Sequence, residues 1–173
     1  MIPLKDNVPR TGLPLATAAL VTLDALAFLL SRRHGGLLPV LLDILLLVLL
    51  GGTLESALGR ARFCVLCLLG GLIAVAARAL LHDDTPGPVV FGAAGASAAV
   101  LGGYLAIHPR ARVLTMVLAP FLATLVELPV ALCLGAWLLA QVLLADESAS
   151  YVTHAGAFAF GLALIGSRAR SSA

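Results

Sequence analysis

Six apolar stretches, separated by charged and turn residues, constrain the fold of this chain more than any other feature. Hydrophobic residues make up 61% of its 173 residues and charged residues 12%, which leaves more apolar surface than one water-soluble core can bury. A helix needs roughly 20 apolar residues to cross a bilayer, and most stretches approach that length. They cover residues 13–30, 37–58, 63–81, 88–107, 128–145 and 151–166. The sequence therefore predicts an all-α membrane protein, a six-transmembrane-helix bundle that forms one domain over residues 1–173.

The number of spans depends on the apolar run that begins at Val113, which is too long for one span and too short for two. Cytoplasmic loops carry an excess of Lys and Arg. Six spans with a cytoplasmic N-terminus place eight of the 11 basic residues inside, namely Lys5, Arg10, Arg60, Arg62, Arg110, Arg112, Arg168 and Arg170. A seventh span would move the last two outside. We therefore predict that residues 113–127 form a partly buried connection at the membrane interface and that both termini are cytoplasmic.

Several classes of function lack a supporting pattern in the sequence. The net charge of +2 follows from membrane topology and indicates no nucleic-acid partner, and no nucleotide, phosphate-binding, cofactor or metal motif is present. Cys64 and Cys67 have C-x-x-C spacing but, like Cys133, fall inside predicted apolar helices, where free thiols usually pack as small core residues. A transporter is disfavoured because the chain shows no inverted repeat or paired broken helices.

Ionisable residues at membrane depth are costly, so they usually face the interior of a helix bundle. The predicted spans contain Asp24, Asp43, Glu55 and His154, and Glu127 lies at the predicted inner interface. An isolated residue of this kind is more often a structural hydrogen-bonding group than a catalytic one. A catalytic interpretation therefore needs several such residues in one place.

Small residues concentrate on the predicted fourth and sixth helices and favour close packing there. The fourth helix carries Gly92, Gly95 and Gly102, and the sixth carries Ala157 and Gly161, one and two turns after His154. These two small faces should meet. That packing would bring His154 close to the outer part of the fourth helix.

Several short strings follow one another in a particular order along the chain. They are "MIPLKDNVP", "HGG" at 34–36, the pattern G-x-x-x-E-x-x-x-G at Gly51, Glu55 and Gly59, "VLGGYLAIHPRARVLT", "VELPVALCLGAWLLAQ" and "THAGAFAFG". In this combination the chain resembles the rhomboid family of intramembrane serine proteases, in its compact bacterial form. The resemblance covers most of the chain and implies a six-helix bundle in a bacterial plasma membrane.

The resemblance also implies where the family's catalytic groups would lie. Family members use a serine in G-x-S-G on the fourth helix and a histidine base on the sixth. An ungapped match of "VLGGY" to the family's V-L-G-A-Y places the serine position on Ala94 and the base on His154. The two oxyanion-stabilising side chains of the family fall on Pro39, which has no side-chain donor, and on Asp43, which would repel an oxyanion if it is ionised. The family's long loop between the first two helices is also missing.

Two functions follow from this comparison. The first is a pseudoprotease, not an enzyme, that binds or scaffolds transmembrane segments of other membrane proteins or forms part of a membrane complex. The second is an active intramembrane protease in which a slipped register, "GASA", offers Ser97 to His154. The structural interpretation of Ser97 is a hydrogen bond back to the carbonyl of residue 93 or 94. Asp43 and His154 are also predicted to form a polar clasp, in which the carboxylate favours the charged imidazole.

Overall fold

The structure is a computed structural model of the chain, and it describes residues 2–6, 13–31, 37–81, 88–119, 122–144 and 148–171. Residues 32–36, which include the "HGG" string at 34–36, lie outside these residues, as do residues 1, 7–12, 82–87, 120–121, 145–147 and 172–173.

Within the described residues, each of the six apolar stretches carries helix. The helices are α1 (Leu15–Ser31), the continuous run of α2 (Leu37–Leu46), the π-helical turn η1 (Leu47–Gly51) and α3 (Gly52–Leu58), then α4 (Arg60–Leu81), α5 (Pro88–Ile107), α6 (Val130–Leu144) and α7 (Ser148–Ser171). Helix α4 begins three residues before Phe63, and α7 begins before Tyr151 and continues beyond Gly166. Pro39 lies in the first turn of α2, where a backbone N–H has no partner within the helix.

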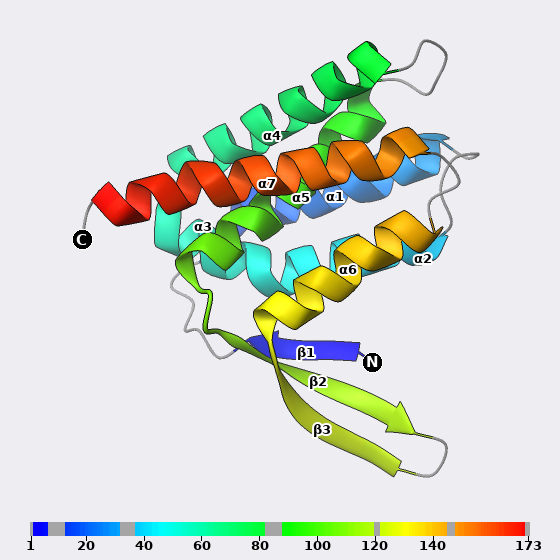
Figure 1. Cartoon of the computed structure of the whole chain (residues 1–173), viewed down its shortest axis with the longest axis vertical. Coiled ribbons are helices and arrows are strands. Elements are labelled where there is room, and N and C mark those ends of the chain that lie inside the picture. The colour runs from blue at the N-terminus through cyan, green and yellow to red at the C-terminus, as the bar shows by residue number, and fades with distance from the viewer. Residues whose placement is uncertain are drawn as a thin grey trace.

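A three-stranded antiparallel sheet stands beside the helices, so the prediction of an all-α fold was wrong in this part of the chain (Figure 1). Strand β1 (Ile2–Asp6) pairs with β2 (Arg112–Ala119), which pairs with β3 (Leu122–Pro129), in the order β1-β2-β3. The segment predicted as an interface-level connection is therefore a β-hairpin. The periodicity of a short apolar run does not show whether the run forms a strand or a helix. In addition, the pairing of β1 with β2 joins residues more than 100 positions apart, such as Ile2 and Met116.

Helix α5 forms the centre of the bundle, with α4 and α7 packed along it (Figure 1). Every residue from Gly95 to Tyr104 is buried, so this helix is enclosed on all sides over that length. The enclosure follows from the sequence, since the small side chains of α5 let neighbouring backbones approach from several directions.

Glycines set the closest approaches to α5. A Cβ on Gly71 of α4 would lie 2.8 Å from the carbonyl oxygen of Gly92. On the other side, a Cβ on Gly161 of α7 would collide with the carbonyl of Ala99, and one on Gly102 would collide with the carbonyl of Phe158. The small faces of α5 and α7 therefore meet, and α4 contributes a second small face against α5.

The outer surface of the bundle carries exposed leucines and valines on most helices, for example Leu68 and Leu72 on α4 and Leu132 and Leu143 on α6. Two helical segments of the described chain, Val40–Leu58 and Arg60–Leu80, have the length and composition to cross a membrane. The other apolar helical stretches among the described residues are shorter, at 10–17 residues. This apolar exterior suits lipid rather than water.

Candidate functional site

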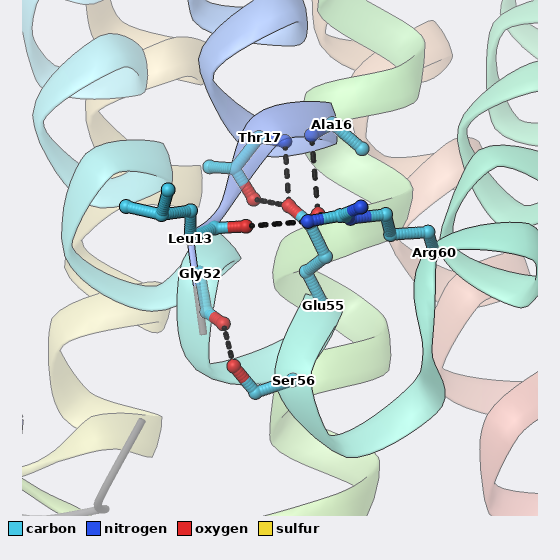
Figure 2. Close-up of polar contacts among 7 residues, drawn as sticks. All are labelled: Leu13, Ala16, Thr17, Gly52, Glu55, Ser56 and Arg60. Atoms are coloured by element: carbon cyan, nitrogen blue, oxygen red, sulfur yellow. Dashed lines mark hydrogen bonds and ion pairs between the residues drawn. The ribbon is translucent and has the colours of Figure 1, made fainter. Parts of the chain in front are cut away.

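Glu55 of α3 forms a buried polar joint with the start of α1 (Figure 2). Its Oε2 accepts hydrogen bonds from the Thr17 backbone N–H and the Thr17 hydroxyl, both at 2.8 Å, and its Oε1 accepts one from the Ala16 N–H at 3.1 Å. The first N–H groups of a helix have no partner within that helix, and a negative charge there is favoured by the helix dipole. Glu55 therefore acts as an N-terminal cap for α1, supplied from a different helix.

The two glycines of the G-x-x-x-E-x-x-x-G pattern shape the same joint. A Cβ on Gly51 would lie 2.7 Å from the Thr17 Cγ2, so only glycine lets α1 approach η1 this closely. Gly59 has a φ of 77°, a conformation that side chains disfavour, and its N–H bonds the Glu55 carbonyl at 2.9 Å. Arg60 closes the joint from outside, with its Nε 3.7 Å from Glu55 Oε1 and its Nη2 3.3 Å from the Leu13 carbonyl (Figure 2).

The second group of polar residues surrounds the N-terminal half of α5. Ala99 faces Gly161 and Ala106 lies beside Gly166, so α5 and α7 run parallel and residues that share a level differ by about 60 in number. His154 therefore lies close to the level of Ala94. The structure thus brings the predicted base position and the predicted nucleophile position to the same depth of the bundle.

His154 is buried against an aromatic side chain. Its ring lies 6.2 Å from the ring of Trp137 on α6, in an edge-to-face arrangement, and Trp137 also stacks near Phe158. The indole Nε1 of Trp137 is buried and has no hydrogen-bond partner among the described residues. Trp137 is not among the residues predicted from the sequence, although a lone tryptophan in a predicted span is a usable signal.

Ser97 turns its hydroxyl to α1. Its Oγ lies 2.5 Å from the Asp24 Oδ2 and 3.2 Å from the Ala93 carbonyl oxygen, and the residue is fully buried. The hydrogen bond back to residue 93 is the one that the structural interpretation predicted. Asp24 was expected to make an interior polar contact with no named partner, and the structure identifies that partner as Ser97.

Asp43 lies on α2, buried, within Coulombic range of Asp24. Its Oδ1 has no hydrogen-bond partner among the described residues. The acidic neighbour of Asp43 is therefore a feature that the sequence analysis did not anticipate. The polar clasp between Asp43 and His154 stays a prediction.

The remaining singled-out residues are peripheral to these two groups. Glu127 on β3 is exposed and forms an ion pair with Arg112 of β2, with 3.6 Å between its Oε2 and the arginine Nη1. Cys64 is exposed on α4, which corrects the expectation that it is a core thiol, while Cys67 and Cys133 are half-buried. The described part of the chain holds no group of three or more His, Cys, Asp or Glu side chains suited to a metal ion.

Comparison with known proteins gives one match. A family model described as the Rhomboid domain matches residues 26–170. No curated protein and no solved structure matches the chain significantly.

Proposed function

The chain belongs to the rhomboid family, and from that membership we propose that it is a non-catalytic rhomboid-like membrane protein that binds or scaffolds the transmembrane segments of other membrane proteins. The rhomboid family includes serine intramembrane proteases. In our proposal, this chain differs from those proteases because it lacks their serine nucleophile and their oxyanion-stabilising side chains.

The observation that carries the proposal is the hydrogen bond between Ser97 and Asp24. Ser97 is the one serine on α5, and the family's nucleophile position holds Ala94, whose methyl group has no nucleophilic atom. The Ser97 hydroxyl is directed to α1 and lies three residues further along α5 than Ala94, about 4.5 Å along the axis. This arrangement favours a structural role for Ser97 over activation by His154.

The positions that stabilise an oxyanion in the family support the same proposal. Pro39 carries no side-chain donor. Asp43 is buried with an acidic neighbour, Asp24, and a carboxylate there would destabilise a developing negative charge. A chain that lost only its serine would have kept these two donors.

The proposal includes a topology and a location. We propose six spans, with α2, η1 and α3 forming one of them, both termini in the cytoplasm, and residence in a bacterial plasma membrane. The exposed leucines of α4 and α6 and the distribution of Lys and Arg support this arrangement. In that orientation the three-stranded sheet lies on the cytoplasmic side.

The experiment that tests loss of catalysis is labelling with a fluorophosphonate probe. Purified native chain in detergent is compared with Ser97→Ala, and an active rhomboid protease serves as positive control. We expect no labelling of either form of this chain. Labelling that disappears in Ser97→Ala would overturn the proposal and restore the protease function with Ser97 as nucleophile.

The scaffold function needs a separate test, which places a photo-crosslinking residue at Leu132 on α6 or at Leu72 on α4. Both side chains are exposed in the structure. If a client binds to one face of the bundle, we expect a discrete cross-linked protein band from the probe on that face and no such band from the probe at the other position. Lipid adducts alone from both positions would contradict a scaffold for transmembrane clients.

A further inference from the structure

Three polar side chains from three helices converge inside the bundle. Asp24 comes from α1, Asp43 from α2 and Ser97 from α5, and each is buried. Ser97 contacts Asp24, while Asp43 is 5% exposed, lies within Coulombic range of Asp24 and leaves its Oδ1 without a hydrogen-bond partner among the described residues. The function proposed above uses Asp43 only as a lost oxyanion position and does not explain this group.

The charge of the group is the physical problem. Two ionised carboxylates in a low-dielectric interior would repel each other and would each need several hydrogen bonds or a cation. The 2.5 Å contact between Ser97 Oγ and Asp24 Oδ2 has the length of a hydroxyl bonded to an ionised carboxylate. Asp24 is therefore the member that is equipped to hold a negative charge.

Asp43 has the opposite surroundings. A carboxylate oxygen that is buried and lacks a hydrogen-bond donor is costly when the group is ionised, and much less costly when the group is neutral. We propose that Asp24, Asp43 and Ser97 form a proton-binding site in which Asp43 holds the proton at neutral pH and Ser97 fixes the remaining charge on Asp24. The proton thereby makes the approach of α1, α2 and α5 compatible with two buried acidic residues.

Titratable and charged groups on the neighbouring helices also act on the charges of Asp24 and Asp43. Helix α1 packs against α2, α3, α4 and α5, and α2 packs against α1, α5 and α6. The titratable and charged side chains that the described parts of these neighbours offer are Glu55 on α3, Arg60, Arg62, Cys64, Cys67 and Arg78 on α4, Tyr104 on α5 and Cys133 on α6. Of these, Cys67 lies within Coulombic range of Asp24, and Glu55 is bonded to the start of α1. A thiol so placed adds no positive charge, so Cys67 leaves the need for a proton unchanged.

The contact between Ser97 and Asp24 argues against a metal ion held between these two oxygens. Oxygen ligands stand at least 2.0 Å from even a small ion such as Mg²⁺, and neighbouring ligands in octahedral geometry are then about 2.8 Å apart or more. Ser97 Oγ and Asp24 Oδ2 are closer than that. The hydrogen atom of the Ser97 hydroxyl fits this distance, so these two oxygens form a hydrogen bond and are not joint ligands of one ion.

Infrared spectroscopy of the full chain in detergent tests the proposal, because a protonated carboxyl group has a carbonyl stretch separate from the amide bands. We expect this band at neutral pH, shifted in D₂O and shifted again when aspartate is labelled with ¹³C at the carboxyl carbon. The band should disappear in Asp43→Asn and persist in Asp24→Asn. The matched control is Glu127→Gln, which removes an exposed carboxylate and should leave the band unchanged.

Three results would overturn the proposal, two from the band itself and one from its response to metal ions. One is the lack of an aspartate carboxyl band in the native chain at neutral pH, a result that needs no variant to fold. The other is a band that Asp43→Asn leaves unchanged. A native band that Na⁺ or Mg²⁺ abolishes relative to K⁺ would show that the site binds a metal ion instead. None of these outcomes depends on fluorophosphonate labelling, so this inference and the proposed function fail separately.

Discussion

The Glu55 carboxylate on α3 and Thr17 at the start of α1 are joined by two hydrogen bonds of 2.8 Å, one from the Thr17 backbone N–H and one from its hydroxyl. The residues are 38 positions apart, yet together they complete the end of one helix. This relationship gives the G-x-x-x-E-x-x-x-G pattern a physical role. Gly51 permits the approach, Glu55 supplies the cap and Gly59 turns the chain into α4.

Neutralising the cap should destabilise the fold. In Glu55→Gln, the two backbone N–H groups and the hydroxyl lose a charged acceptor, and we expect the free energy of unfolding to fall by about 2 kcal/mol. Thermal unfolding in detergent measures the loss. Arg60→Gln is the matched control, because Arg60 is 60% exposed and its ion pair with Glu55 should contribute less than about 1 kcal/mol. Equal losses in both variants would show that the ion pair, and not the cap, stabilises the joint.

Replacing Gly59 should isolate the effect of backbone conformation. A Cβ at Gly59 would meet nothing within 4 Å, so Gly59→Ala introduces no clash, but its φ of 77° disfavours a side chain. We expect a loss of roughly 1–3 kcal/mol in the free energy of unfolding. Gly59→Asn should lose about as much, because the ψ of 153° lies outside the left-handed helical region that asparagine tolerates. An alanine variant as stable as the native chain would contradict this backbone conformation.

The contact between α5 and α7 should be sensitive to one methyl group at Gly161. In Gly161→Ala, the new Cβ would collide with the Ala99 carbonyl, and we expect a loss of about 1–3 kcal/mol in the same unfolding measurement. Gly156→Ala on the same helix is the control. A Cβ there meets nothing within 4 Å, so the variant should be stabilised by roughly 0.5–1 kcal/mol. Equal shifts in both variants would argue against the close α5–α7 contact.

The ring contact between Trp137 and His154 gives a spectroscopic prediction. Trp137 is the one tryptophan of the chain, and the two ring centroids are 6.2 Å apart. An imidazole in contact with an indole quenches its fluorescence, and His154→Phe keeps an aromatic ring but removes the imidazole. We therefore expect stronger emission from His154→Phe than from the native chain at the same pH. Equal emission from both proteins would contradict the contact.

Restoring a serine should not by itself restore a protease. Ala94→Ser supplies a hydroxyl at the level of His154, but Asp43 supplies no amide donor for the oxyanion, and its ionised form would repel it. We therefore expect faster fluorophosphonate labelling of the double variant Ala94→Ser/Asp43→Asn than of Ala94→Ser alone. The double variant with His154→Phe added is the control and should remain unlabelled. Equal labelling of the single and double variants would show that Asp43 has no influence on this position.

Much of the helical framework could be predicted from the sequence. Long apolar stretches bounded by charges and turn residues left few alternatives to helix, and the glycine and alanine content of α5 predicted a helix with close neighbours. The level of His154 beside Ala94 also followed, because small residues repeat along both α5 and α7. These features depend on local length and periodicity, which a sequence contains directly.

The partners of the polar residues could not be predicted in the same way. Glu55 could be recognised as part of a pattern, but its bonds to Ala16 and Thr17 depend on how α1 meets α3. Asp24 and Ser97 lie 73 positions apart, and nothing near either residue indicates the other. The strand β1 likewise has no sequence signal that points to β2.

The sequence by itself determined the family, the apolar helices and the residues that the resemblance aligns with the family's catalytic positions, because each is a matter of composition, spacing or residue identity. Only the tertiary structure decided that a sheet joins the N-terminal strand to the hairpin, that Glu55 caps α1, and that Ser97 bonds Asp24 with Asp43 within Coulombic range. The physical reason is that hydrogen bonds and charge pairs between distant segments depend on how helices pack. Packing is set by many weak contacts that no local pattern contains.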